Sequence, residues 1–309
     1  MKRREFIKAG VNAGIATSAA IAFGNLNTLF ASPNGTPTLP YDLVAVRNGE
    51  ADVMFDKAIQ SLGGMESFVK SGQTVVVKPN IGWDVSPERA GNTNPQLIKR
   101  IIEHCYNAGA KEVKVFDNTC DDWNKCYETS QIGDLAKEAG AKMVPGNSES
   151  YYKEVEIPKG VSLKNAKVHK LILESDVFIN VPVLKHHSSA DLSIAMKNLM
   201  GVVWDRMYWH RNDLHQCIAD YCLHRPPDLN VIDAYRVIMK NGPRGVSVED
   251  VVTYKTQIVS TDIVAADAAA TKVFGSDPED IGYITKAAEL GIGTYKLEDL
   301  NINRIKLEG

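Results

Sequence analysis

Short β-branched runs alternate with segments of helical periodicity between residues 53 and 274. The pattern predicts strands over residues 74–78, 111–116, 142–144, 177–183, 229–232 and 257–260, and helices over residues 53–62, 95–107, 132–139, 213–223 and 263–274. Strands that alternate with helices form a mainly parallel sheet covered on both faces. We therefore expect a three-layer, Rossmann-like α/β fold, but without the Gly-x-Gly-x-x-Gly dinucleotide fingerprint.

The first residues have the pattern of an export signal. Arg3-Arg4 is followed by Phe6 and Lys8, and then by a stretch of small residues over 9–23 that is too weakly apolar for a lipid-spanning helix. The pattern resembles a twin-arginine signal peptide over residues 1–31, cut after Ala31. It implies the twin-arginine translocation machinery as a partner. The mature chain is expected to be periplasmic or otherwise exported, with no stable membrane span.

Composition narrows the class of protein further. Residues 32–40, rich in Pro, Ser, Thr and Gly, are predicted to be a linker, followed by a single domain over 41–309 with an excursion near 145–170. The net charge of −3 and the lack of a Lys/Arg stripe with interleaved aromatics argue against nucleic acid as a partner. The five cysteines include no Cys-x-x-Cys pair, so an iron–sulfur cluster is not expected, and a Cys120–Cys126 disulfide stays an open question.

Polar and charged side chains follow several of the predicted strands. They are Lys78, Asn80, Asp117, Lys185, His187 and Asp233. Each of them alone has an ordinary explanation as a turn cap or a surface charge. Together they predict a pocket, because ligands of open parallel sheets bind at the carboxyl ends of the strands.

Several short motifs resemble those of the DUF362 family, which is named for its lack of an assigned function. They are Lys78-Pro-Asn80, Lys185-x-His187, Lys197-Asn198-x-x-Gly201, Leu214-His215, Asp220, Leu229-Asn230-x-x-Asp233 and Asn241-Gly-Pro243. The resemblance covers most of residues 74–270 and implies no particular reaction. The expected architecture also has a loose likeness to the nickel-pincer lactate racemases, which leaves cofactor chemistry open although no motif is shared.

The lysines of these motifs predict a site for a small anion. Lys185 and Lys197, joined by Lys78, supply ammonium groups, while Asn80 and Asn198 supply orienting amides. The wider set of expected substrate-binding residues is Lys78, Asn80, Asp117, Lys197, Asn198, Asp233 and Asn241. The turn at Asn241 either adds backbone N–H groups to the site or is a plain glycine loop.

Histidines supply the second half of the expected chemistry. Lys185, His187 and His215 are the predicted catalytic residues. Lys185 lies two residues before His187, so its charge should lower the pKa of the imidazole and keep it neutral. His187, His215 and His210 are also candidate ligands of a divalent metal, whereas a metal-free Lys/His site is the alternative.

Two functions of different class remain open from the sequence. The first is an exported enzyme that acts on a small carboxylate or phosphate, with or without a metal. The second is a non-catalytic accessory protein that holds a metal or cofactor for an exported redox partner. Catalytic turnover would distinguish the two.

Overall fold

The computed structural model describes residues 39–308, and Pro40–Gly309 forms one compact unit. The predicted signal peptide over residues 1–31 and nearly all of the predicted linker lie outside the described residues. Within the described residues no helix combines the length and the apolar character needed to cross a membrane. All five cysteines, Cys120 and Cys126 included, are free thiols.

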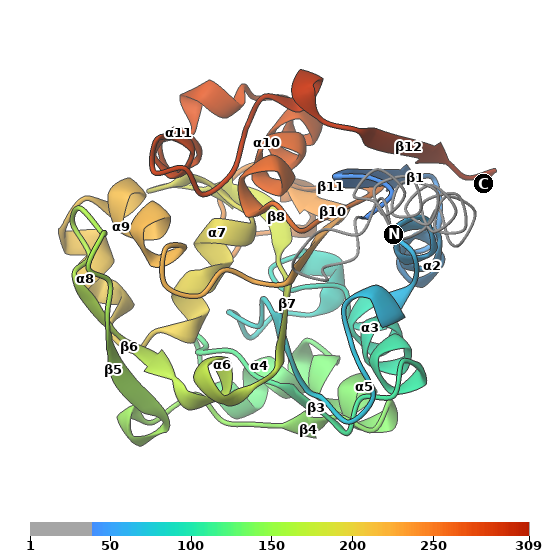
Figure 1. Ribbon diagram of the computed structural model, residues 1–309, viewed down its shortest axis with the longest axis horizontal. Coiled ribbons are helices and arrows are strands. Elements are labelled where there is room, and N and C mark those ends of the chain that lie inside the picture. The colour runs from blue at the N-terminus through green and yellow to red at the C-terminus, as the bar shows by residue number, and fades with distance from the viewer. Residues whose placement is uncertain (1–38, 309) are drawn as a thin grey trace, which may run out of the picture. The chain divides into compact units, whose positions relative to one another are not determined.

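A mixed, mostly parallel sheet forms the centre of the fold (Figure 1). Its strands run in the order β12 (Ile302–Lys306), β1 (Leu43–Arg47), β11 (Val251–Ser260), β10 (Leu229–Ile238), β7 (Val177–Val181), β2 (Thr74–Pro79), β3 (Glu112–Val115) and β4 (Lys142–Met143). Only β11 is antiparallel to its two neighbours along this path. The α/β fold expected from the alternating pattern is therefore confirmed.

Helices cover both faces of the sheet. On one face lie α2 (Ala51–Ser61), α3 (Pro95–Asn107) and α5 (Ile132–Glu138), and on the other lie α9 (Leu214–Tyr221), α10 (Ile263–Phe274) and α11 (Gly282–Glu289). The alternation of side chains along β2 follows from the two-residue period of a strand: Val75 and Val77 pack into the first layer and Val76 into the second. Because both faces are buried, the central strands have almost continuous apolar sequences.

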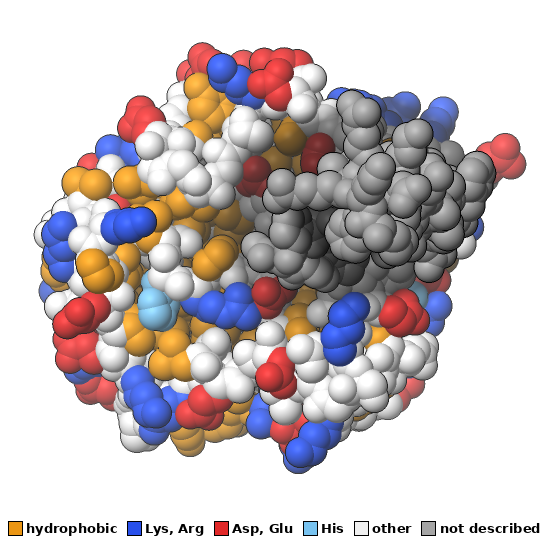
Figure 2. Space-filling model, viewed as in Figure 1, with side chains coloured by type: hydrophobic (Ala, Val, Ile, Leu, Met, Phe, Trp, Pro, Cys, Tyr) orange, Lys and Arg blue, Asp and Glu red, His pale blue; other side chains and the backbone are white. Residues whose placement is uncertain are grey.

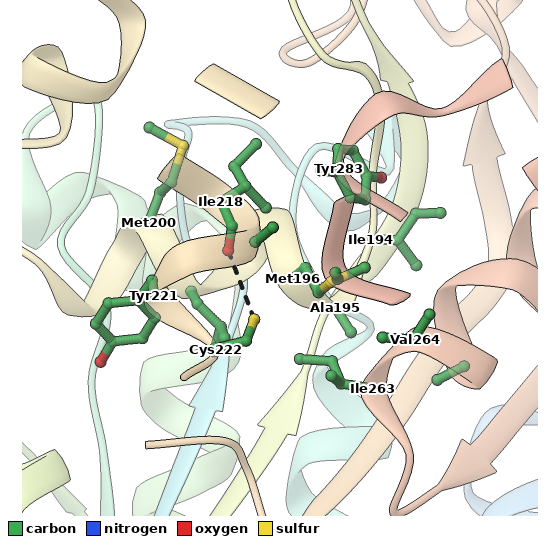
Figure 3. Packing of buried hydrophobic residues seen from close by; sticks show 14 of the residues in the cluster. Ile194, Ala195, Met196, Met200, Ile218, Tyr221, Cys222, Ile263, Val264 and Tyr283 are labelled. Carbon is green, nitrogen blue, oxygen red and sulfur yellow. Dashed lines mark hydrogen bonds between the residues drawn. The ribbon is translucent and has the colours of Figure 1, made fainter. Parts of the chain in front are cut away.

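The second apolar layer also holds α7 (Ala195–Asn198), the short helix that carries part of the Lys-Asn motif. Figure 3 shows Met196 of this helix packed among Ile218 of α9 and Ile263 and Val264 of α10. Asp267 of α10 accepts hydrogen bonds from the backbone N–H groups of Ala195 and Met196, at 2.7 and 3.0 Å. These contacts hold α7 against the sheet, since the carboxylate satisfies donors that the first helical turn leaves unpaired.

Two predicted strands have different bounds in the structure. The run over 177–183 divides at Pro182 into β7 and β8 (Val183–His187), so Lys185 and His187 lie within a strand and not after one. β8 pairs with β10 and with β9 (Asp191–Ser193). The run predicted to end at residue 232 continues to Ile238, so Asp233 lies inside β10, opposite Gln257 of β11. Both predictions were wrong in the same way, because polar residues stay in a strand when a neighbouring strand pairs with them.

The remaining elements are short. β5 (Tyr152–Glu156) and β6 (Asn165–His169) form a separate two-stranded sheet in the region where the sequence predicts an excursion. This sheet touches the segment after α7 through a bridge between Val168 and Val203. α4 (Trp123–Thr129), α6 (Lys170–Glu174) and α8 (Arg206–Arg211) complete the helices.

Candidate functional site

A cavity of about 220 Å³ lies where β2, β3 and β7 end and where β8 and α7 approach each other. Its polar lining comes from several elements: Asn80, Asp117, Asn118, Cys120, Lys185, His187, Ser193, Lys197, Asn198, Arg206 and His210. Figure 2 shows Lys and Arg side chains beside a His side chain near the middle of the viewed face. The structure thus brings together, from the predicted residues, Asn80, Asp117, Lys185, His187, Lys197, Asn198 and His210.

Lys78 lies beneath this cavity and does not line it. Its ammonium group is fully buried, 2.8 Å from an oxygen of Asp117, and donates to the carbonyl of Pro79 at 2.6 Å and to Oδ1 of Asn198 at 3.0 Å. Burial lowers the pKa of Lys78, and the charge of Asp117 opposes that shift. Three acceptors around one ammonium group leave it no capacity for a ligand, so Lys78 anchors α7 to the end of β2.

This buried ion pair explains why position 201, the last of the Lys-Asn-x-x-Gly motif, is a glycine. A Cβ atom at position 201 would lie 2.0 Å from Oδ1 of Asp117 and 2.7 Å from Nζ of Lys78. The backbone N–H of Asn118 donates to the carbonyl of Gly201 at 3.1 Å. A side chain therefore cannot be placed here without displacing the ion pair.

Lys185 reaches the cavity from β8 and is also hydrogen-bonded. Its ammonium group donates to Oδ1 of Asn80 at 2.6 Å and to the carbonyl of Gly91 at 2.5 Å. Burial lowers the pKa of Lys185 to about 7, while the two acceptor oxygens favour its charged form. Lys185 and Asn80 therefore form a fixed donor–acceptor pair at one side of the cavity.

Lys197 differs from the other two lysines. It projects from α7 into the cavity, and its ammonium group has no hydrogen-bond or ion-pair partner among the described residues. Burial lowers the pKa of Lys197 to about 8, and the positive charge of Arg206 acts in the same direction. Lys197 is thus the lysine of the site whose nitrogen is available to a ligand.

His187 is buried and neutral. Burial, followed by the charges of Lys197 and Lys185, lowers its pKa to about 2. The backbone N–H of Ser189 donates to Nδ1 of His187 at 3.1 Å, so the neutral ring carries its proton on Nε2. In this tautomer Nε2 of His187 is a hydrogen-bond donor, which does not suit the role of base or metal ligand that the sequence suggested.

The three histidines considered as metal ligands do not converge on one point. The rings of His187 and His210 are stacked with centroids 6.2 Å apart. His215 is outside the cavity, stacked on Tyr283 of α11 and 3.9 Å from Asp191 of β9. Among residues 39–308 no three His, Cys, Asp or Glu side chains are placed to hold a metal ion. The expected approach of His215 to the pocket is therefore wrong, because α9 packs its first turn against β9 and α11.

Asp233 and Asn241 also lie outside the cavity. The two oxygens of Asp233 accept the backbone N–H groups of Asn94, at 2.7 Å, and Tyr235, at 3.0 Å. Asp233 lines a different cavity of about 380 Å³ beside α3. Asn241 donates to Asp250 at 2.9 Å, and Pro243 is the part of its turn that reaches the first cavity. Both side chains therefore stabilise local backbone structure.

Arg206 and Cys120 line the cavity but were not among the predicted site residues. Arg206 opens α8 and donates to the backbone carbonyls of Asn118, at 2.7 Å, and Thr119. Cys120 lies three residues after Asp117, which follows β3. This short separation in sequence could have indicated that Cys120 also lines the site. No sequence signal identifies Arg206, because its contacts with the loop after β3 arise only from tertiary folding.

The charges of the cavity do not balance. Lys185, Lys197 and Arg206 line it, whereas the one lining carboxylate among the described residues, Asp117, is engaged by Lys78. A neutral imidazole adds a further hydrogen-bond donor. This set of donors is suited to holding a small anion, because ammonium and guanidinium groups make their strongest hydrogen bonds to carboxylate or phosphate oxygens.

Comparisons with known proteins agree with the motifs. The chain is 25% identical over 248 residues to the thylakoid-associated protein sll1697 of Synechocystis sp., covering 78% of this chain and 75% of the relative. Among solved structures, the lactate racemase apoprotein from Thermoanaerobacterium thermosaccharolyticum aligns with a TM-score of 0.48 at 12% identity, over 74% of this chain and 56% of that chain. The model of the family described as "Domain of unknown function (DUF362)" matches residues 75–272. Because this match spans most of the chain, the protein belongs to the DUF362 family.

Proposed function

We propose that the chain is an enzyme that acts on a small carboxylate or phosphate bound in the cavity between β2, β3, β8 and α7. The observation that carries the proposal is the excess of positive charge that lines the cavity at Lys185, Lys197 and Arg206. Burying a cation without a partner is unfavourable, and a bound anion offsets that cost. Carboxylates and phosphates are the small anions whose oxygens match these donors.

The proposed roles follow from the contacts of each side chain. Lys185, held by Asn80, positions the anion. His187 donates through Nε2 to an oxygen of the substrate, in the neutral form that its environment favours. Lys197 is the group with an available nitrogen, and it can accept or deliver a proton near neutral pH because its pKa is lowered to about 8. No step of this proposal requires a metal ion.

Binding of inorganic phosphate tests the proposed site directly. Calorimetry should show saturable binding by the wild-type chain and an affinity reduced at least about thirtyfold in Lys197→Met, since losing one buried charged partner costs about 2 kcal/mol or more. Lys240→Met is the matched control, because the Lys240 side chain is 66% exposed and does not line the cavity. No binding by the wild-type chain to phosphate or to L-lactate would overturn the proposal.

Turnover separates the enzyme from the accessory protein. Small carboxylates and phosphate esters incubated with the chain, with product formation followed by NMR, should yield at least one reaction that Lys197→Met abolishes. Phosphate binding without turnover of any compound would favour the accessory role. That outcome would leave the anion site in place and reject catalysis.

Export is the second part of the proposal and has an independent test. Arg3-Arg4, Phe6 and the weakly apolar stretch support a twin-arginine signal, and the Synechocystis relative is named as thylakoid-associated. Replacing Arg3-Arg4 by Lys-Lys should leave uncleaved precursor in the cytoplasm, detected by cell fractionation. The matched control is Lys2→Arg, which keeps the arginine pair. Unchanged export of the Lys-Lys variant would contradict the twin-arginine route.

A further inference from the structure

The three lysines near the cavity differ in how fully their nitrogens are hydrogen-bonded. Lys78 has three acceptors within 3.0 Å, namely Asp117, the carbonyl of Pro79 and Asn198. Lys185 has two, Asn80 and the carbonyl of Gly91. Lys197 has none among the described residues, although its side chain lines the same cavity. A lysine nitrogen hydrogen-bonded to fixed acceptors is held in place by them, whereas one without acceptors is free to approach a ligand.

We propose that Lys197 is a nucleophilic amine that forms an imine with the carbonyl group of a small anionic carbonyl compound, such as a 2-oxo acid or a phosphorylated ketone. This inference rests on the proposed anion site and names its substrate class. Lys185 and Arg206 hold the carboxylate or phosphate at the cavity wall. The carbonyl carbon of the same small molecule then lies within reach of the remaining nitrogen, because the cavity measures only about 220 Å³.

The step balances without an oxidant or reductant. The lone pair of Lys197 attacks the carbonyl carbon, a C–N bond forms, and the electron pair of the C=O bond moves to the oxygen. The two hydrogens of the amine leave with that oxygen as water, and the product is the imine. Because Nδ1 of His187 accepts the N–H of Ser189, Nε2–H is the donor of this ring, and its role in the proposed step is to donate to the oxygen as negative charge develops there.

The electrostatic surroundings support the same assignment. The charge of Lys197 is the second cause, after burial, of the lowered pKa of His187, which indicates that the two groups share one region of the cavity. Burial together with Arg206 lowers the pKa of Lys197 to about 8, so an unprotonated fraction is present near neutral pH. Nucleophilic lysines are activated in this way, by desolvation beside another cation.

Reductive trapping tests the proposal. The full chain is incubated with pyruvate and sodium cyanoborohydride, and in a second arm with dihydroxyacetone phosphate, and the products are mapped by peptide mass spectrometry. The expected result is one reduced adduct, on Lys197 and not on Lys185 or Lys78. The arm that gives the faster labelling distinguishes a carboxylate site from a phosphate site. L-Lactate, which has the carboxylate but no carbonyl, should slow the labelling by pyruvate.

Two variants test whether the adduct requires the amine of Lys197. Lys197→Arg keeps the charge but has no nucleophilic amine, so it should keep phosphate binding and lose the adduct. Lys240→Arg alters an exposed lysine and should leave labelling unchanged. Labelling of Lys185, or labelling spread over exposed lysines and insensitive to L-lactate, would overturn the proposal. Phosphate binding without any adduct would exclude imine formation and leave the proposed anion site supported. If neither phosphate binding nor an adduct is found, the proposed function is excluded as well. Protection by L-lactate is measured on the wild-type chain, so the test does not depend on a variant that folds.

Discussion

Charged side chains have opposite surroundings at Asp233 in β10 and at the cavity beside α7. At Asp233 the carboxylate is 3% exposed, and each of its oxygens accepts a backbone N–H group. At the cavity beside α7, Lys197 has no partner among the described residues, and only Asp117 supplies a carboxylate. A buried carboxylate whose two oxygens each accept a backbone N–H has a structural role, whereas a cation in a cavity without a partner identifies a place for a ligand.

The ion pair between Lys78 and Asp117 combines features of both regions. It borders the cavity, yet its own charges compensate each other at 2.8 Å. It therefore contributes to the site by holding Asn198 and the segment around Gly201 in place, and not by binding the ligand.

The largest expected effect follows from breaking this ion pair. Asp117→Ala leaves the ammonium of Lys78 fully buried and without its charge partner, so the free energy of unfolding should fall by about 3–5 kcal/mol. Urea denaturation followed by circular dichroism measures the change. The double variant Lys78→Met/Asp117→Leu removes both charges and should recover most of the loss. A single variant as stable as the wild type would contradict the structural role of the pair.

A smaller loss of stability is expected at the fully hydrogen-bonded carboxylate. Asp233→Ala leaves the N–H groups of Asn94 and Tyr235 without acceptors, so the free energy of unfolding should fall by about 1–3 kcal/mol. Phosphate affinity should stay unchanged, because Asp233 does not line the anion cavity. Urea denaturation and calorimetry on the same sample provide the two measurements. A drop in phosphate affinity without loss of stability would contradict the structural role of Asp233 and indicate that it takes part in anion binding.

The smallest expected effect is a pH dependence of anion affinity. The pKa values of Lys185 and Lys197 are lowered to about 7 and about 8, so both ammonium groups lose charge as the pH rises through this range. Sulfate, whose own charge is constant there, should bind more weakly as the pH rises. His187 adds nothing to the change, since its pKa is lowered to about 2 and it is neutral throughout. Calorimetry across this range measures the slope, and an affinity that increased with pH would contradict charged lysines as the anion binders.

The sequence predicted the fold well where local patterns are strong. The helices predicted over 95–107 and 263–274 have those bounds in the structure, because Asn94 and Asp262 cap their first turns. The strand from 229 was predicted too short, and the run over 177–183 divides into β7 and the start of β8. Pairing of β8 with β10 and β9 keeps Lys185 in an extended strand, and this contact depends on chain segments remote in sequence.

Most of the predicted site residues lie together near the strand ends, but the set differs from the lining of the cavity. Asn80 and Asp117 lie in one cavity region because parallel strands end at the same edge of a sheet. β8 adds Lys185 and His187 to this region, and α7 adds Lys197 and Asn198. His215 and Asp233 do not join them, and Arg206 does. Whether a polar residue faces the cavity depends on which helices and strands pack around the cavity. The spacing of residues in the sequence does not reveal this packing.

The class of fold, the family and the lysine-rich edge of the sheet can be predicted from the sequence, because strand and helix periods and short motifs are local properties of the chain. Which of the three lysines keeps an available nitrogen, and which tautomer His187 adopts, depends on tertiary packing. Those properties depend on acceptors and donors, such as the carbonyl of Gly91 and the N–H of Ser189, whose positions are set when the sheet and α7 pack together.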